Sequence, residues 1–406
     1  MRERPDGRRR VAVTGLGIVS AIGLGVDEFL AGLRAGTSAA RPISAFDTEG
    51  FDYANGCEVP NRTAPATDRG RSAQFAVDAA RLAVDDAGLS PADIAAQRVT
   101  IAVGTTDGES RDLDDLTAQQ CADGPEAMDP AVVDRVQPLR MSAAIAREFG
   151  AERADVLTLA TACAAGNYAI GYGYDAVRSG EADVALAGGA DALCRKTFTG
   201  FYRLGTIAPD VCRPFDAHRE GILTGEGAGI LVLEPMDVAL ARGARIYAEV
   251  LGYGLACDAT HAVAPDGPGI ARCISVALDA AGVAPHEVDL VSAHGTGTRA
   301  NDVTEVGALS AVFGQALPRT ISIKSMLGHS MGAASALGAA ASALALRHQF
   351  IPPTINHRDT DLDCPVDCVP NVSVDADLSV VQNNGLAFGG NNAVLVLGRV
   401  ADEVPA

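Results

Sequence analysis

The sequence predicts an α/β fold made of two copies of one unit, stacked in five alternating layers so that the copies share a core. Three features occur twice in the same order: a helix with the same ending, a short β-branched strand, and a strand that turns directly into a helix. Apolar runs without polar alternation indicate strands that are covered on both faces. We expect the two units to span residues 1–245 and 246–406.

Two predicted amphipathic helices end in the same way. The first ends at Gly88 and is followed by Pro91, and the second ends at Gly282 and is followed by Pro285. Glycine accepts the left-handed conformation that often closes a helix, and proline prevents the helix from continuing.

The strands that follow these helices also match. Val99–Val103 corresponds to Val288–Ala293, and Val156–Ala160 corresponds to Ile321–Lys324. The boundary between the copies is expected near residues 242–245, before a new strand at Ile246–Leu251.

Three further segments have less specific patterns. The Gly15–Ser20 segment faintly resembles a dinucleotide-binding loop, but it lacks the third glycine, which favours a packing turn. Met331–Leu346 carries no charge and is too short to cross a bilayer, so it predicts a buried core helix. Ala393–Leu397 is a predicted strand.

Bulk composition excludes several classes of function. The formal net charge of −19 over 406 residues argues against nucleic acid or an anionic membrane as the main partner. The nine cysteines lack regular spacing, which is typical of reduced thiols, and the Cys364–Cys368 pair lacks the further ligands of a zinc site. We therefore expect no bound metal. No apolar signal-peptide core follows the N-terminal arginines, so we also expect no membrane segment and a cytoplasmic location.

Cys163 lies between a predicted strand and a predicted helix that runs to about Arg178. The positive end of a helix dipole favours thiolate, so this position predicts a nucleophile. A buried cysteine is also an ordinary small apolar residue, and position alone does not separate the two interpretations.

Two histidines follow strands in corresponding parts of the second copy. His294 opens the His-Gly-Thr-Gly-Thr segment that includes Thr296 and Thr298, and His329 follows Gly328. A single histidine at a strand end is usually structural. Two of them, in a duplicated chain that also supplies Cys163, predict a site at which the histidines transfer protons.

Ser330 offers a rival interpretation, because residues 328–332 form the Gly-x-Ser-x-Gly pattern of α/β-hydrolases. That fold requires an acid and then a histidine later in the chain. Only His348 and His357 follow, and neither has a suitable position. Near the C-terminus, Phe388 stands before two glycines, Gly389 and Gly390, as in a mobile gate, although a hairpin turn fits as well.

Taken together, these segments resemble the elongating β-ketoacyl–acyl-carrier-protein synthases of the thiolase fold, over nearly the whole chain. The resemblance rests on residues 11–20, 161–163, 214–216, 225–228, 294–298, 324–325 and 328–329, and on the Phe388 loop.

The resemblance implies a decarboxylative condensation. Cys163 would accept an acyl chain from the phosphopantetheine of a carrier protein, and His294 and His329 would promote decarboxylation of a malonyl thioester. The backbone N–H groups of Cys163 and Phe388 would form the oxyanion hole. Lys324 and Glu305 would hold the histidines by charge pairing. The substrate-binding residues that it implies are Thr296, Thr298, Thr106, Asp107, Gly389 and Gly390.

The chain departs from the family pattern in three places. Asp107 follows Thr106 where elongating enzymes have an apolar lining of the acyl pocket, so either the substrate is polar or short, or Asp107 faces a partner subunit. Ala387 replaces a glycine in the gate. A basic loop near residues 208–212 is shortened, which leaves Arg62, Arg69 and Arg71 as the expected docking site for the carrier.

These departures favour a specialised type II polyketide or polyene ketosynthase, with fatty-acid elongation as the alternative. The partners implied are an acyl carrier protein and either a second copy or a ketosynthase-like subunit. No resident cofactor is implied. A non-catalytic chain-length partner is a further alternative, but it would not need Cys163.

Overall fold

The computed structural model describes residues 9–60 and 68–400. Within these ranges, ten strands of one large sheet form a continuous path, and β2 (Gly23–Leu24) pairs with β1 beside it. The path runs through β12 (Arg319–Ile321), β11 (Leu290–Ser292), β15 (Val380–Gly385), β16 (Asn391–Gly398), β10 (Ala248–Cys257), β1 (Val11–Ser20), β9 (Gly227–Pro235), β7 (Val184–Asp191), β5 (Val99–Gly104) and β6 (Ala154–Leu159).

The sheet has the same strand order on either side of its centre. Starting from β1, the N-terminal half continues through β9, β7, β5 and β6, and starting from β10, the C-terminal half continues through β16, β15, β11 and β12. In both halves the first two pairings are antiparallel and the last two are parallel. This correspondence confirms the predicted duplication.

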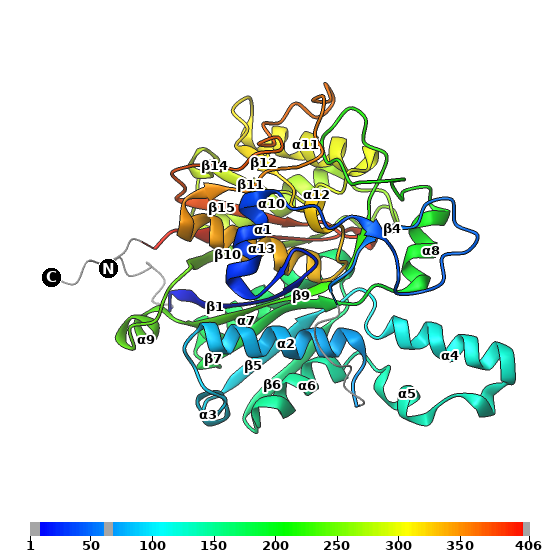
Figure 1. The fold of residues 1–406 in the computed structure, drawn as a ribbon. Coiled ribbons are helices and arrows are strands. Elements are labelled where there is room, and N and C mark those ends of the chain that lie inside the picture. Colours follow the sequence, from blue (N-terminus) through cyan, green and yellow to red (C-terminus); the bar gives the residue numbers. More distant parts are fainter. Residues whose placement is uncertain (1–8, 61–67, 401–406) are drawn as a thin grey trace.

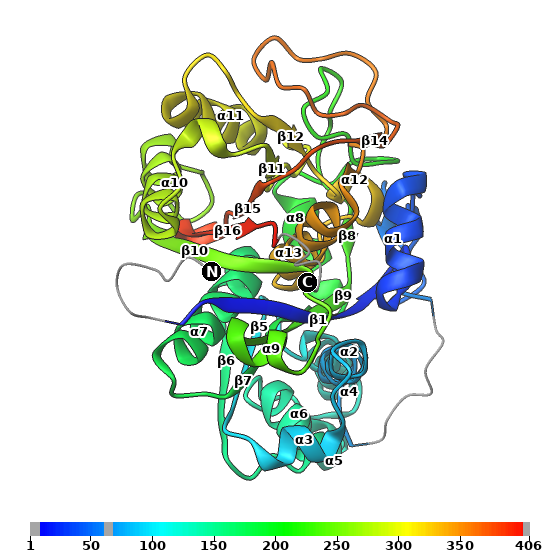
Figure 2. The same ribbon diagram turned by 90° about the vertical axis from the view of Figure 1, so that its left-hand side faces the viewer.

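Helices lie on both faces of each half of the sheet, which gives the predicted five layers (Figures 1 and 2). Helices α2 (Arg71–Asp86) and α6 (Arg140–Phe149) cover the N-terminal half. Helices α10 (Gly267–Ala281) and α11 (Arg299–Phe313) cover the C-terminal half. Helices α7 (Ala165–Ser179) and α13 (Ala333–His348) lie between the halves and contact strands of both.

The predicted core helix is α13. Its residues from Ala333 to Leu346 are all buried, and its charged residues stand only in the last turn. Alanine, glycine and serine dominate this helix, so it packs closely against α7 in the middle layer. In the described part of the chain, no helix is long and apolar enough to cross a membrane.

Gly15 and Gly17 lie inside β1, so the predicted turn at this place is wrong. Their predicted packing role is confirmed. A Cβ atom on Gly17 would lie 1.7 Å from the carbonyl oxygen of Ala79 in α2, and one on Gly15 would lie 2.2 Å from that of Ala83. Glycine lets helix and sheet approach closely here.

The predicted helix ends are confirmed, whereas several strand predictions differ from the structure. Gly88 has φ of 67° and Gly282 has φ of 66°, the left-handed conformation predicted for both. Strand β6 is at the sheet edge and is only partly covered, with Val156 37% exposed. The prediction that the strand before Cys163 is covered on both faces is therefore wrong. The strand expected at Ile246 begins at Ala248, and the one expected to reach Lys324 ends at Ile321.

The remaining elements are connections and small additions. The helices are α1 (Gly25–Ala35), α3 (Pro91–Ala96), α4 (Ser110–Asp123), α5 (Pro130–Arg135), α8 (Arg195–Arg203), α9 (Met236–Ala241) and α12 (Lys324–Leu327), and the strands are β3 (Arg41–Pro42), β4 (Asn55–Cys57), β8 (Thr224–Gly225), β13 (Phe350–Ile351) and β14 (Val374–Asp375). Four 3₁₀ turns span Pro125–Ala127 (η1), Ala162–Ala164 (η2), Pro285–Glu287 (η3) and Phe388–Gly390 (η4). Helices α4 and α5 extend away from the body (Figure 1).

Candidate active site

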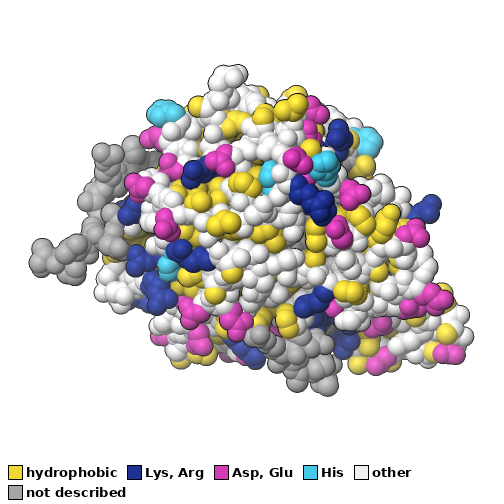
Figure 3. Space-filling model, turned by 45° about the horizontal axis from the view of Figure 1, so that its top comes forward, with side chains coloured by type: hydrophobic (Ala, Val, Ile, Leu, Met, Phe, Trp, Pro, Cys, Tyr) yellow, Lys and Arg dark blue, Asp and Glu magenta, His cyan; other side chains and the backbone are white. Residues whose placement is uncertain are grey.

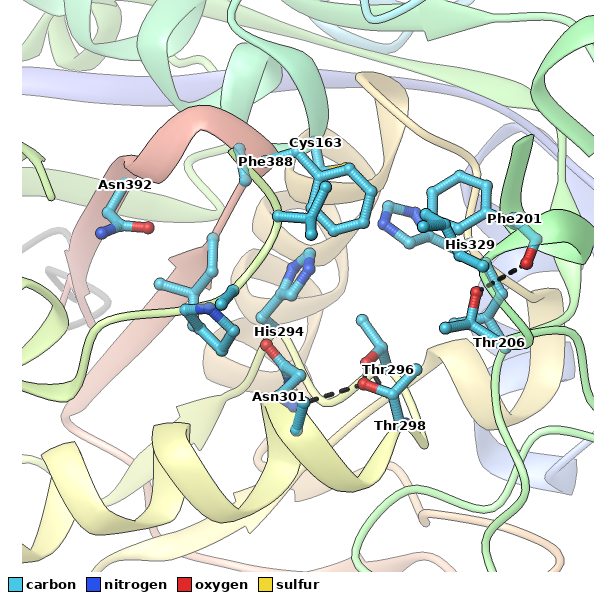
Figure 4. A pocket seen from close by; sticks show the side chains of 18 of the residues that line it. Cys163, Phe201, Thr206, His294, Thr296, Thr298, Asn301, His329, Phe388 and Asn392 are labelled. Carbon is cyan, nitrogen blue, oxygen red and sulfur yellow. Dashed lines mark hydrogen bonds between the residues drawn. The ribbon is translucent and has the colours of Figure 1, made fainter. Parts of the chain in front are cut away.

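One cavity of about 280 Å³ brings together side chains from both halves of the chain. Figure 4 shows Cys163 from the N-terminal half beside His294 and His329 from the C-terminal half. The cavity is also lined by Phe201, Leu204, Thr206, Ile222, Asp258, Val263, Ala264, Pro265, Thr296, Thr298, Ala300, Asn301, Leu386, Ala387, Phe388 and Asn392. The three residues predicted to carry the chemistry therefore share one site.

Cys163 lies in the 3₁₀ turn η2 between β6 and α7. The preceding residue, Ala162, has φ of 51°, a left-handed conformation that costs a non-glycine residue about 1 kcal/mol. Burial raises the pKa of the Cys163 thiol to about 12, against the opposing effect of the Lys324 charge. The pKa is thus raised where the sequence predicted a lowered one, because burial outweighs the favourable position before α7.

His294 and His329 meet edge to face, with ring centroids 5.3 Å apart and the planes at 82°. Both are buried, and burial together with the Lys324 charge holds both pKa values well below 6.5. The backbone N–H of Met331 donates to Nδ1 of His329 at 3.1 Å. The proton of neutral His329 is therefore on Nε2, where it can be donated.

Glu305 is fully buried in α11 and holds the backbone on which His294 stands. Its carboxylate accepts the N–H groups of His294 at 2.7 Å and Gly295 at 2.8 Å. The side-chain amides of Asn301 and Asn384 also donate to it.

Lys324 lies at the start of α12, buried near the two histidines. Burial lowers its pKa, and the charge of Glu305 acts in the opposite direction. Among the described residues no ion pair within 4 Å joins Lys324 to Glu305. The predicted charge pairing therefore acts across space and not as a direct contact.

Thr296 and Thr298 line the cavity below His294 (Figure 4), where the sequence predicted substrate contacts. Their hydroxyl groups lie 2.9 Å apart. The Thr298 hydroxyl also accepts the N–H of Asn301 at the start of α11. This loop fixes the orientation of both hydroxyl groups at the cavity wall.

Phe388 is 39% exposed, and its ring lies 5.5 Å from the ring of Phe201 across the cavity. Gly389 and Gly390 follow with φ of 77° and 74°, and neither lines the cavity. Gly389 donates to the carbonyl of Ala262 at 2.7 Å. Ala387 has φ of −140° and ψ of 152°, an extended conformation open to any residue, so alanine in place of glycine brings no strain there.

Thr106 and Asp107 do not line this cavity. The Asp107 carboxylate accepts from Lys196 Nζ at 2.9 Å and from the Thr197 hydroxyl at 2.6 Å, both in α8 of the same chain. One Asp107 oxygen and the Thr106 hydroxyl are buried without a hydrogen bond. Asp107 therefore forms an internal ion pair away from this cavity, while the pocket that holds the acyl chain and the position of Asp107 relative to a partner subunit stay predictions.

Two of the three arginines expected to bind the carrier are paired with acidic side chains. Arg62 lies outside the described residues. Arg69 pairs with Asp68 and Glu148, and Arg71 pairs with Glu226 at 2.6 Å. Their charges are already compensated, so their predicted role in docking loses support.

Helix α8 presents an alternative surface beside the cavity. It contains no acidic residue, and Arg195, Lys196 and Arg203 are exposed on it. Leu204, at its end, is 50% exposed and lines the cavity mouth. On the face of the molecule shown in Figure 3, by contrast, basic and acidic side chains are interspersed.

The rival nucleophile is not in the cavity. Ser330 is fully buried, and its hydroxyl makes no hydrogen bond and lies outside the cavity lining. Since a hydrolytic serine needs a base and access to substrate, the geometry gives no support to a serine hydrolase. Within residues 9–60 and 68–400, no group of three His, Cys, Asp or Glu side chains could hold a metal.

Sequence reasoning missed Phe201, Asn301 and Asp191. Phe201 lines the cavity from α8, which carries no motif, and Asn301 lines it from the first turn of α11, where the sequence singles out only Glu305. Asp191 is fully buried near Cys163, and its position at the end of an apolar strand was the only available signal.

Comparisons with known proteins fit this geometry. The model described as "Beta-ketoacyl synthase, N-terminal domain" matches residues 8–239, and the corresponding "C-terminal domain" model matches residues 247–358. A 3-oxoacyl-[acyl-carrier-protein] synthase 2 of Staphylococcus aureus (strain N315) is 36% identical over 405 residues, which is 96% of this chain and 98% of the relative.

Solved structures agree. "The ishigamide ketosynthase/chain length factor" shares 60% identity at a TM-score of 0.95, with 97% of this chain and 100% of that chain covered. A type II PKS ketosynthase in complex with its acyl-carrier protein shares 33% identity at a TM-score of 0.91, with the same coverage.

Proposed function

The chain belongs to the β-ketoacyl synthase family and is a condensing acyltransferase, and on this premise we propose that Cys163, His294 and His329 carry out its reaction. The observation that carries the proposal is their meeting in one cavity, with the nucleophile from one half of the chain and the two histidines from the other. The products are a chain lengthened by two carbons, CO₂ and a free carrier thiol.

The first step loads the enzyme. The sulfur of Cys163 attacks the acyl thioester on a carrier, the new thioester forms, and the phosphopantetheine thiol leaves. Because the pKa of the resting thiol is raised to about 12, its proton must be taken up as the thiolate forms, and neutral His294 is the acceptor, since both ring nitrogens of His329 are already engaged. Helix α7 stabilises the developing negative charge.

The second step breaks one carbon–carbon bond and forms another. The malonyl carboxylate leaves as CO₂, and the electron pair of the broken bond becomes an enolate on the thioester. Nε2–H of His329 donates to the enolate oxygen, and His294 offers a second neutral ring beside it. The enolate carbon attacks the acyl-Cys163 carbonyl, whose oxyanion is held by the N–H groups of Cys163 and Phe388, and the Cys163 thiolate leaves.

Lys324 and Glu305 support this chemistry without touching the reacting atoms. Burial keeps the pKa values of both histidines low, the Lys324 charge adds to this effect, and Glu305 fixes the backbone of His294 and Gly295. Thr296 and Thr298 would receive the amides of the pantetheine arm, which their position in the cavity wall supports, and Phe388, Gly389 and Gly390 would form the gate.

Both substrates would arrive on the phosphopantetheine of an acyl carrier protein, and the reaction as written needs no resident cofactor or metal. A carrier complex is known for the 33% identical relative, which supports a carrier partner here. Since carriers are acidic, Arg195 and Arg203 on the exposed face of α8, beside the cavity mouth, are a better docking site than the paired Arg69 and Arg71.

The specialised polyketide or polyene pathway is the favoured setting. Identity is 60% to the ishigamide ketosynthase/chain length factor and 36% to the 3-oxoacyl-[acyl-carrier-protein] synthase 2 of Staphylococcus aureus. The pairing of a ketosynthase with a chain length factor in the first of these supports assembly with a ketosynthase-like partner over a homodimer. A chain-length partner without catalysis would have no use for the complete set of Cys163, His294 and His329.

Two expectations stay predictions. The boundary between residues 245 and 246 falls between α9 and β10, and the two family models meet close to it. A cytoplasmic location is supported by the nine cysteines, which are all free thiols.

Intact-mass measurement after incubation with acyl-carrier protein tests the mechanism. We expect an acyl adduct that is absent in Cys163→Ala, and a β-ketoacyl product when malonyl-carrier protein is added. A panel of primers then separates polyketide from fatty-acid specificity. An adduct that persists in Cys163→Ala but disappears in Ser330→Ala would overturn the proposal.

A further inference from the structure

Asp191 ends β7 as a fully buried carboxylate that accepts four hydrogen bonds. Three come from the turn after β5: the Thr105 hydroxyl at 2.5 Å, the N–H of Thr106 at 2.8 Å and the N–H of Asp107 at 3.0 Å. The fourth comes from the N–H of Gly332 at 2.6 Å. One side chain in the N-terminal half therefore holds a peptide group of the C-terminal half.

The Gly332 peptide connects this carboxylate to both catalytic turns. Gly332 lies three residues after His329, and its carbonyl accepts the N–H of Gly166 at 3.1 Å, three residues after Cys163. A Cβ atom on Gly332 would lie 2.6 Å from the Cα of Thr105 and 2.7 Å from an Asp191 oxygen. The two turns are therefore packed so closely that a side chain at Gly332 would not fit between them.

A carboxylate is the side chain that this arrangement requires. Each Asp191 oxygen receives two donors: Oδ1 from Thr105 and Asp107, and Oδ2 from Thr106 and Gly332. An asparagine would have to place its NH₂ group against two donors in either orientation. Asp191 does not line the cavity, so it cannot touch the substrate there.

We infer that Asp191 is a positioning residue, which sets the separation of Cys163 and His329 by fixing Gly332 against the Thr105–Asp107 turn. The inference rests on the proposed function and adds a residue to it. A displacement of about 1 Å between reacting groups costs on the order of 100-fold in rate, so kcat is the quantity that must respond.

The experiment compares Asp191→Asn with Glu58→Gln. Glu58 is also buried, accepts three hydrogen bonds, from the N–H groups of Ser44 and Ala45 and the Ser44 hydroxyl, and like Asp191 does not line the cavity, but its donors do not belong to either catalytic turn. We expect Asp191→Asn to lose about 100-fold in kcat for condensation at unchanged KM for malonyl-carrier protein. Glu58→Gln should keep its kcat. Equal kcat losses in both variants, or none in Asp191→Asn, would refute the inference.

A second variant covers the case in which Asp191→Asn does not fold. Burial and the charge of Asp107 raise the pKa of Asp191 to about 7, and the Thr105 hydroxyl lowers it. Two titratable groups lie near it, Asp107 after β5 and Cys163 before α7. From the start of α13, Gly332 contributes a backbone N–H, which does not titrate. Protonated Asp191 loses an acceptor, so kcat of the wild type should fall as the pH drops through this pKa.

In Thr105→Val this fall in kcat should move to higher pH, because the hydrogen bond that lowers the Asp191 pKa is gone. Both histidines titrate well below 6.5 and cannot produce it. An unchanged pH profile in Thr105→Val would contradict the inference. Absence of any condensation by the wild type would instead contradict the proposed function, so the two failures are distinguishable.

Discussion

Replacing Glu305 with glutamine should disable the enzyme although the two side chains have the same shape. Oε1 accepts from the N–H of His294 at 2.7 Å and the Asn384 amide at 2.9 Å, and Oε2 accepts from the N–H of Gly295 at 2.8 Å and the Asn301 amide at 3.2 Å. In either orientation the glutamine NH₂ group meets two donors. Two hydrogen bonds to a charged acceptor are lost at about 1.5–3 kcal/mol each, which gives about 3–6 kcal/mol.

Two assays measure the effect. Denaturant unfolding should show the loss of stability, and kcat for condensation should fall by about 100-fold as the His294 backbone moves. The matched control is Glu234→Gln, since Glu234 is a buried carboxylate that accepts from Thr14 and Arg242 and does not line the cavity. That variant should lose stability and keep its kcat. A Glu305→Gln enzyme with wild-type stability and kcat would refute the reasoning.

Three further predictions follow from charges in and around the site. Lys324→Met should raise the pKa values of His294 and His329, because the Lys324 charge lowers both; imidazole NMR titration measures this, and unchanged pKa values would contradict it. Arg203→Glu should raise KM for the acyl-carrier protein with little change in kcat, and Arg69→Glu should do so less; equal effects would exclude α8 as the preferred docking site. The pKa of Asp191 is raised from 3.8 to about 7, so the native state retains a proton that the unfolded chain releases, and its contribution to stability is lost as the pH rises through about 7. The unfolding free energy of the wild type relative to that of Asp191→Asn, measured between pH 4 and 8, should therefore fall as the pH rises, and a constant difference would disprove this contribution.

Sequence reasoning reached the fold because the repeats are periodic and local. The helix ends at Gly88 and Gly282 and the paired strands depend on neighbouring residues, and they reappear in the two halves of the sheet. The placement of Cys163, His294 and His329 in one cavity followed from the same duplication.

The errors concern properties that only three-dimensional packing sets. A strand pattern cannot tell that β6 stands at the edge of the sheet, where one side lacks a neighbour. The pKa of Cys163 depends on burial among residues far away in the chain, and burial outweighed the helix position. The pairing of Asp107 with Lys196, 89 residues later, and the contact of Asp191 with Gly332 have no local signal at all.

The strained residue before Cys163 has a counterpart in the other half of the chain. Ala162 has φ of 51° just before α7, and Met331 has φ of 50° just before α13. Each left-handed residue costs about 1 kcal/mol, and the chain retains this cost twice although only the first turn presents a nucleophile. The strain therefore belongs to the repeated unit and not to the cysteine. The unit supplies a sharp turn at a helix start, and the two copies use it differently: one turn carries a thiol into the cavity, and the other lies directly after an imidazole that lines it.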